Sequence, residues 1–242
     1  MWRIQSYRRI LLSGLLRTPT GLMNLLQMTV LSYYFGNNGR TPYVHYMLLL
    51  GIPAFLGQLI AAGAAPKLAD KHGAANTFAK ANVLAGLALL AAFALFLCRP
   101  QQLTQAMPFT LLILLLFCNM FCCGLVNTVQ SILIADVADQ TEKESGIRRD
   151  GIFVSGQSLL IKLSTGVSAL LQGLVFAISG FSGTAVSQIN RTLYAGADFA
   201  TDPSFAAPRF AMFFLFLCLP GIAYLLSALP YRKSRNSHRV PE

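Results

Sequence analysis

Long apolar segments recur along the whole chain and are separated by short polar stretches. A transmembrane helix needs about 20 predominantly apolar residues, and six segments meet that length. These predicted spans cover approximately residues 10–35, 43–65, 77–98, 108–135, 152–181 and 210–229. The pattern predicts an all-α membrane protein with a six-helix transmembrane bundle over residues 1–231 and a basic cytoplasmic tail over residues 232–242.

The amino-acid composition agrees with a membrane protein. Of the 242 residues, 55% are hydrophobic and only 12% are charged, whereas a soluble domain carries about 25% charged residues. A single N-terminal signal peptide does not account for apolar segments that recur throughout. The net charge of +10 comes from basic residues scattered between apolar runs, so we expect membrane lipid as a partner and no nucleic acid.

The Lys and Arg residues of the loops fall on the two sides of the predicted bundle unequally. If successive spans alternate in direction, 13 of these cations lie on the side of both termini and 4 lie on the other side. The four are Arg40, Arg99, Arg191 and Arg209. Because cytoplasmic loops carry the excess of basic residues, the distribution predicts that both termini are cytoplasmic.

The five cysteines offer little evidence of a metal site. Cys118 and Cys122 share a helical face, but their segment contains no histidine and only the adjacent Cys123 as a further ligand, which does not complete a four-ligand set. Cysteines in apolar segments usually pack as small apolar residues. We therefore expect no metal site, no disulfide and no cofactor.

Two cations, Arg17 and Lys162, lie inside predicted spans, whereas none of the nine acidic residues lies mid-membrane. Lys162 is about ten residues beyond the cytoplasmic end of its span, which is roughly 15 Å along a helix. Because buried charges are costly and usually pair or line water, we expect Lys162 to face a polar central cavity; a structural ion pair and a shifted helix register are the alternatives. Arg17 is nearer the cytoplasmic end and can partly snorkel, so a structural role is its leading interpretation.

Amide and hydroxyl side chains occur in several of the predicted spans. We expect four of them, from different helices, to line one cavity with Lys162: Gln58, Asn119, Asn127 and Thr165. Other polar candidates in the spans are Asn24, Gln27, Gln130, Gln157 and Ser164. Sugars are bound by several hydrogen bonds and a stacking ring, but such side chains also often only join one helix to another. Both interpretations remain open at this point.

The stretch over residues 135–166 reads ADVADQTEKESGIRRDGIFVSGQSLLIKLSTG. It resembles the corresponding loop of the glycoside–pentoside–hexuronide:cation symporters, the melibiose-carrier-like branch of the major facilitator superfamily. The matching positions are Asp136, Asp139, Glu142, Gly146, Arg148, Asp150 and Gly151, and Lys162 matches a basic residue found eleven positions further in that family. Gln140 and Thr141 depart from it, since the family has an aromatic residue and a glycine there.

The charges of this loop suggest a cytoplasmic gate. Asp136 and Asp139 near a helix C-terminus, and Arg148 and Arg149 near the next helix N-terminus, are each unfavourable against the helix dipoles unless they pair. An ion-pair network that breaks as the two halves rock is therefore one interpretation, and a solvated charged loop is the other. The candidate gate residues are Asp136, Asp139, Glu142, Gly146, Arg148, Arg149 and Asp150.

The resemblance covers nearly the whole chain but only the second six-helix half of a twelve-helix family. It implies a component of a sugar or glycoside:cation symporter that works by alternating access in the bacterial inner membrane, with Na⁺ or H⁺ as the coupling ion. In that family the cation-binding carboxylates lie in the first half. A complementary N-terminal six-helix half, as a separate or missing chain, is therefore the predicted partner of this chain, beside its sugar or glycoside.

Two alternatives to the transporter remain. The first is a transport-incompetent remnant or a six-helix membrane interaction protein, and the second is a self-sufficient homodimeric carrier, which conflicts with the absent carboxylates. No metal cluster, activated nucleophile or acid–base pair appears within a predicted span, so we do not expect an enzyme.

Overall fold

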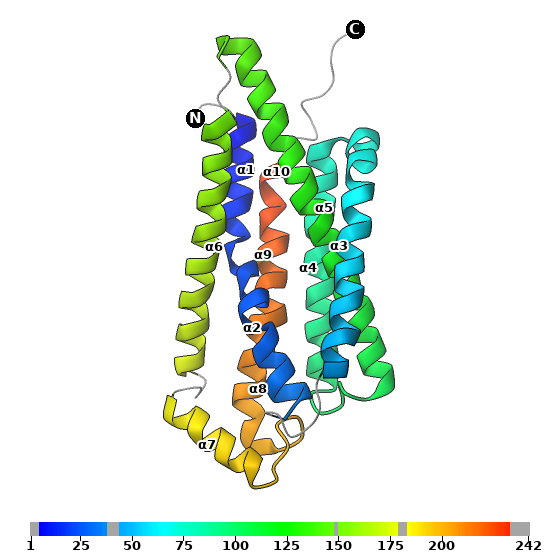
Figure 1. Ribbon diagram of the computed structural model, residues 1–242, viewed down its shortest axis with the longest axis vertical. Coiled ribbons are helices and arrows are strands. Elements are labelled where there is room, and N and C mark those ends of the chain that lie inside the picture. The colour runs from blue at the N-terminus through cyan, green and yellow to red at the C-terminus, as the bar shows by residue number, and fades with distance from the viewer. Residues whose placement is uncertain (1–4, 38–43, 148–149, 179–182, 233–242) are drawn as a thin grey trace.

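The structure is a computed structural model that describes residues 5–37, 44–147, 150–178 and 183–232. In these ranges the regular structure is helical, and the longer helices run roughly along the long axis of the molecule (Figure 1). The first part of the chain forms α1 (Gln5–Leu16), the 3₁₀ turn η1 (Thr18–Gly21), α2 (Leu22–Val30) and the π-helical η2 (Leu31–Phe35). Three long helices follow, α3 (Val44–His72), α4 (Ala74–Cys98) and α5 (Ala106–Ser145).

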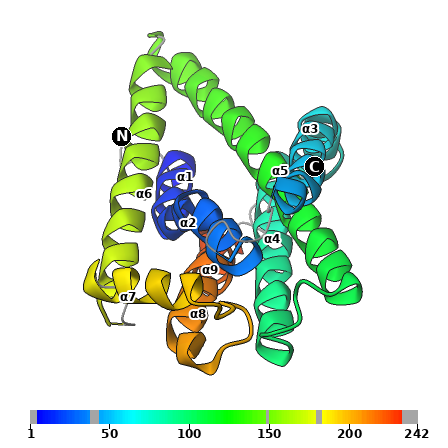
Figure 2. The ribbon, with the colours of Figure 1, turned by 60° about the horizontal axis from the view of Figure 1, so that its bottom comes forward.

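The second part of the chain begins with the long helix α6 (Asp150–Ile178) and the short helix α7 (Gly183–Tyr194). The last membrane segment is built from the 3₁₀ turn η3 (Pro203–Phe205), α8 (Ala206–Phe213), the π-helical η4 (Phe214–Cys218), α9 (Leu219–Ser227) and α10 (Leu229–Arg232). Helices α5 and α6 meet at one end of the molecule and diverge, with α1, α2 and α9 between them (Figure 2).

Five helical stretches among the described ranges are long and apolar enough to cross a membrane, namely residues 44–72, 74–98, 106–145, 151–178 and 203–231. The predicted count of six spans is therefore not confirmed. The first predicted span, residues 10–35, is not one continuous helix, because α1 ends at Leu16 and the 3₁₀ turn η1 follows. Pro19 lies in that turn, where it lacks the backbone N–H that a continuing α-helix needs.

The break leaves the backbone carbonyl of Thr18 without its helical partner. The N–H of Leu22 donates to the carbonyl of Pro19, not to that of Thr18 four residues back. The Thr18 carbonyl instead accepts hydrogen bonds from two hydroxyls of α6, Ser164 Oγ at 2.7 Å and Ser168 Oγ at 3.1 Å. A neighbouring helix thus satisfies the freed carbonyl, as broken membrane helices require.

Helix α6 lies close enough to reach this carbonyl because small residues line the contact. Residues 164 and 168 are four apart and share a helical face. On the opposite side, a Cβ built on Gly21 would lie only 2.7 Å from Ser168 Oγ. A methyl group at Gly21 would therefore displace the Ser168 hydroxyl from its place at the Thr18 carbonyl or push α6 away from the break.

Small residues also set the distance between α3 and α5. The buried positions of α3 recur every four residues, at Gly57, Ala61, Ala65 and Ala69. A Cβ on Gly124 of α5 would meet the Ala61 Cβ at 2.7 Å. Such small-residue faces let membrane helices approach closely, while the larger apolar side chains of α3 point outward. The exposed ones include Leu48, Ile52, Phe55 and Leu59.

Helix α5 extends ten residues beyond the predicted span and ends at Ser145. Asp136 and Asp139 therefore lie inside the helix and not at its C-terminal end, so the dipole argument for pairing them does not hold. Gly146 ends the helix: its φ of 69° is left-handed and its N–H donates to the Glu142 carbonyl at 2.8 Å. This conformation favours glycine, which explains why the loop motif has a glycine at position 146.

The end of the molecule near α7 is held together by a buried arginine. Arg209, expected in an outer loop, lies in α8, is 4% exposed, and its Nη1 donates to the carbonyls of Phe199 and Ala200 at 2.9 and 2.6 Å. Nearby, the hydroxyl and the backbone N–H of Ser204 donate to Asp202 and hold the pKa of that carboxyl below its usual value. These bonds tie the start of α8 to the segment that precedes it.

Removing both hydroxyls that reach the Thr18 carbonyl is expected to destabilise the protein. The double substitution Ser164→Ala and Ser168→Ala leaves a buried carbonyl unsatisfied, which costs about 1–3 kcal/mol. Thermal unfolding of the purified protein in detergent measures the loss. Ser158→Ala, at an exposed position of the same helix, is the matched control, and equal stability of the double variant and this control contradicts the proposed role.

Candidate functional site

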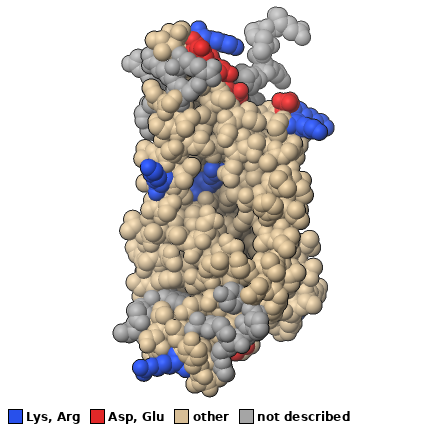
Figure 3. All heavy atoms as spheres, viewed as in Figure 1, with Lys and Arg blue, Asp and Glu red and all other residues tan. Residues whose placement is uncertain are grey.

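A cavity of about 680 Å³ lies between the broken first segment, α3, α5, α6 and α9. Its wall is mixed, with polar side chains set among apolar ones. The polar members are Arg17, Thr20, Asn24, Gln58, Asn119, Asn127, Gln130, Ser131, Gln157, Ser164, Thr165 and Tyr224. Figure 3 shows a hollow near the middle of one face, with one basic side chain inside it and another at the edge of the molecule at the same height.

The structure brings together four of the five side chains predicted to line a cavity. Gln58 comes from α3, Asn119 and Asn127 from α5, and Thr165 from α6. They lie far apart in the sequence, so only the packing of these three helices makes them neighbours. Whether they bind a substrate stays a prediction.

The fifth predicted residue, Lys162, is not among the wall residues, and its side chain is exposed. The cavity face of α6 carries Gln157, Ile161, Ser164 and Thr165. An α-helix has 3.6 residues per turn, so Lys162 points about 100° away from Ile161. Lys162 therefore follows a cavity-facing residue directly in the sequence but lies outside the cavity wall.

The cation that lines the cavity is Arg17, for which the sequence favoured a structural role. Its Nη2 donates to Gln130 Oε1 at 2.6 Å, whereas its Nη1 is buried without a hydrogen-bond partner in the described part of the chain. The wall residues include no Asp or Glu. Arg17 therefore adds a positive charge to the wall, and no carboxylate of the wall neutralises it. The only sequence signal for this role was its position as the second cation inside a span.

Two amide side chains of the wall are each held by a hydrogen bond from the amide nitrogen. Asn119 is fully buried; its Nδ2 donates to the Ala85 carbonyl at 3.2 Å, and its Oδ1 has no partner in the residues described. Gln58 donates from Nε2 to the sulfur of Met120 at 3.4 Å. The wall thus contains a buried, unsatisfied acceptor at Asn119 and, eleven residues further along α5 where Arg17 meets Gln130, a buried, unsatisfied donor.

One side of the wall contains a hydroxyl and a thiol that sequence reasoning did not single out. The Tyr224 hydroxyl donates to Cys123 Sγ at 3.3 Å, and Asn127 Nδ2 donates to the same sulfur at 3.7 Å. Tyr224 lies in α9, in a segment whose sequence shows only apolar character and no sign of a site. Its place in the wall follows from the packing of α9 against α4 and η1.

The predicted gate is only partly described. Asp136 and Asp139 are exposed, Glu142 is half-buried, and Gly146 forms the turn after α5. Arg148 and Arg149 lie outside the described residues, as does the side chain of Asp150. An ion-pair gate between these residues therefore remains a prediction.

The cysteines provide a test of whether water fills the cavity. Cys123 is a wall residue, and the adjacent Cys122 is buried in the core. We expect a charged, membrane-impermeant thiol reagent to modify a variant that retains only Cys123 and to leave one that retains only Cys122 unmodified, because the reactive thiolate forms where water reaches it. Mass spectrometry of the purified variants measures the modification.

Both single-cysteine variants should react fully after denaturation, which controls for the intrinsic reactivity of each thiol. Equal modification of the two folded variants contradicts a water-accessible cavity at Cys123.

Comparison with known proteins places these features in context. The profile of the family described as MFS/sugar transport protein matches residues 1–232. The chain is 26% identical over 189 residues to a protein of Pseudescherichia vulneris described as an uncharacterized 29.9 kDa protein in the crtE 3′ region. The match covers 78% of this chain and 62% of that relative, so the chain spans less than two thirds of the relative's length. No solved structure matches the chain.

Proposed function

Because the chain belongs to the MFS/sugar transport protein family, we propose that it forms one six-helix half of a secondary transporter that moves a sugar or glycoside together with a cation. The observation that carries the proposal is the cavity of about 680 Å³ with a polar wall inside an otherwise apolar bundle. Transport by alternating access, and not catalysis, is the proposed activity.

The size and chemistry of the cavity suit a sugar. Ligand sites typically have volumes of about 300–1,000 Å³ and a few well-placed polar groups. Each sugar hydroxyl both donates and accepts, and the wall offers the amides of Gln58 and Asn127 and the hydroxyl of Thr165, all three on exposed side chains. Transporters of this kind hold their substrate near the bilayer midplane between two halves.

Coupling to Na⁺ or H⁺ needs a group that the cavity wall lacks. A coupling cation is usually bound by intramembrane carboxylates, and the wall contains no Asp or Glu. We propose that a complementary N-terminal six-helix half supplies those acids. Lys162, exposed on α6 at a depth where a lone charge is costly, is then available to pair with a carboxylate of that half.

The proposed arrangement places both termini and the loop between α5 and α6 on the cytoplasmic side of a bacterial inner membrane. It rests on the excess of basic residues on that side. The acids and arginines of the loop would then form the cytoplasmic gate. The alternative, a remnant without transport activity, predicts that no first half restores uptake.

Substitutions in the cavity are expected to weaken glycoside uptake when the chain is co-expressed with a six-helix first half from this family. Gln58→Ala removes one hydrogen bond worth about 0.5–1.5 kcal/mol, which is roughly a 2- to 12-fold increase in KM. Arg17→Met should have a larger effect, because bonds to charged groups are stronger. Uptake of labelled glycosides into proteoliposomes, with and without a Na⁺ or H⁺ gradient, measures both.

Gln188→Ala, at an exposed position of α7, is the control and should leave KM unchanged. Unchanged uptake in both the Gln58 and the Arg17 variants would show that the cavity is not the substrate site. In the same assay Lys162→Gln tests the pairing proposal, and uptake equal to that of the unmodified chain would remove Lys162 from the mechanism.

A further inference from the structure

A groove of about 630 Å³ lies between the end of α4 and the start of α5. We call it the α4–α5 groove. It is separate from the polar cavity, because no residue belongs to the walls of both. Its wall consists of six apolar residues, one hydroxyl and one charge: Leu95, Ala106, Met107, Pro108, Leu111, Leu114, Thr110 and Arg99.

The groove begins where a membrane-spanning helix ends. Helix α4 ends at Cys98 and Arg99 follows directly, at the end of the molecule that also holds α7 (Figure 1). From there the wall follows α5 from Ala106 to Leu114, eight residues or about 12 Å along the helix axis. In a bilayer that α4 and α5 span, Arg99 therefore lies at the level of the headgroups, and Leu114 lies at the level of the acyl chains.

The apolar side chains of the groove are turned outward and not into the core. Met107 is 81% exposed, Leu111 is 43% exposed and Leu114 is 58% exposed. The Thr110 hydroxyl donates to the Ala106 carbonyl of its own helix at 2.8 Å, so it adds little polarity to the wall. Below Arg99 the groove therefore offers an apolar surface to the hydrocarbon of the membrane.

The other end of the groove is positively charged. No carboxylate of the wall neutralises Arg99. Within the described residues, its side chain makes one hydrogen bond, from Nη1 to Gln102 Oε1 at 3.2 Å. The start of α5 adds a field of the same sign, because the side chain of Gln105 does not cap the helix and the N-terminal end of a helix dipole is positive. This end therefore favours a negatively charged group.

The two ends of the groove together select one class of ligand. A phospholipid carries a phosphate above an apolar chain, in the order in which the groove presents Arg99 and the leucines. A guanidinium binds phosphate by two parallel hydrogen bonds. A soluble phosphate leaves the apolar part of the groove empty, and a lipid without net charge leaves the charge of Arg99 unbalanced.

We propose that the α4–α5 groove binds an anionic phospholipid, with the phosphate at Arg99 and one acyl chain along Leu95, Leu111 and Leu114. The lipid contacts both helices at the point where they are connected. The site lies outside the polar cavity, so it does not depend on which substrate the cavity takes.

The test maps where a photoactivatable lipid attaches to the purified full chain in phosphatidylcholine nanodiscs. Phosphatidylglycerol or phosphatidylcholine with a diazirine in its acyl chain is added as a minor component. After illumination, mass spectrometry of peptides gives the label on Leu111 and Leu114 relative to that on Leu59, an exposed residue of α3 outside the groove. The ratio should be about fivefold higher for phosphatidylglycerol, the factor that one arginine contributes near an anionic lipid surface.

Two variants test the two ends of the groove independently. Arg99→Gln removes the charge and should abolish the preference for phosphatidylglycerol, whereas Arg191→Gln, at an exposed position of α7, should retain it. Leu111→Trp fills the groove and should lower the phosphatidylglycerol label at Leu114. Leu87→Trp places the same ring at an exposed position of α4 outside the wall and should leave that label unchanged.

Three results overturn the proposal. Equal labelling of the groove by the two lipids shows that it holds only the ordinary lipid of the surrounding bilayer. A preference for phosphatidylglycerol that persists in Arg99→Gln, or a label at Leu114 that persists in Leu111→Trp, places the lipid elsewhere. Loss of the label on addition of glycerol phosphate, which has the headgroup and no chain, assigns the site to a soluble phosphate. The uptake assay tests the sugar site separately.

Discussion

The backbone carbonyl of Thr18 is the group on which the arrangement of this bundle depends. The 3₁₀ turn at Pro19 takes away its helical partner, the Leu22 N–H, and two hydroxyls of α6, Ser164 and Ser168, replace that partner. In a bilayer an unsatisfied carbonyl costs several kcal/mol, so the break and α6 must stay together. Arg17 directly precedes the break and Ser164 lies in the cavity wall, so one hydrogen-bonding requirement sets both the position of α6 and the wall of the cavity.

Two cations of the described residues, Arg17 and Lys162, lie within predicted membrane spans, and the cavity wall contains no carboxylate to balance them. Arg17 lines the cavity with one nitrogen unpaired, Lys162 is exposed on α6, and the cavity wall contains no carboxylate. Uncompensated cations at such depth are expensive, and they are explained most simply if another surface bearing acids covers this face. A polar, cationic face of this kind is what one half of a two-half transporter would present to the other.

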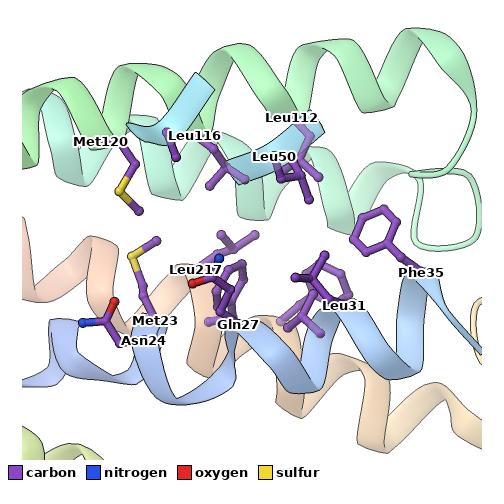
Figure 4. Close-up of a pocket in the computed structure, with 14 residues that line it drawn as sticks. Met23, Asn24, Gln27, Leu31, Phe35, Leu50, Leu112, Leu116, Met120 and Leu217 are labelled. Carbon is purple, nitrogen blue, oxygen red and sulfur yellow. The ribbon is translucent and has the colours of Figure 1, made fainter. Parts of the chain in front are cut away.

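Packing of small residues determines the shape of the wall. Gly124 allows α5 to approach Ala61 of α3 closely, which holds Gln58 against Met120. Met120 then lines both the polar cavity and a smaller, mostly apolar hollow of about 60 Å³ (Figure 4). The two hollows thus differ in polarity although they share side chains.

The sequence by itself determined the all-helical membrane class, the major facilitator superfamily and four residues of the cavity wall, because hydropathy and the loop motif are local properties of the chain. It did not determine which of two cations faces the cavity, since a step of one residue turns a helix by about 100°, and Lys162 lies one step from Ile161. It also did not show that the first segment is broken, that α5 continues to Ser145, or that Arg209 is buried. Those features depend on which neighbour satisfies each carbonyl and charge, and only the tertiary structure decides that.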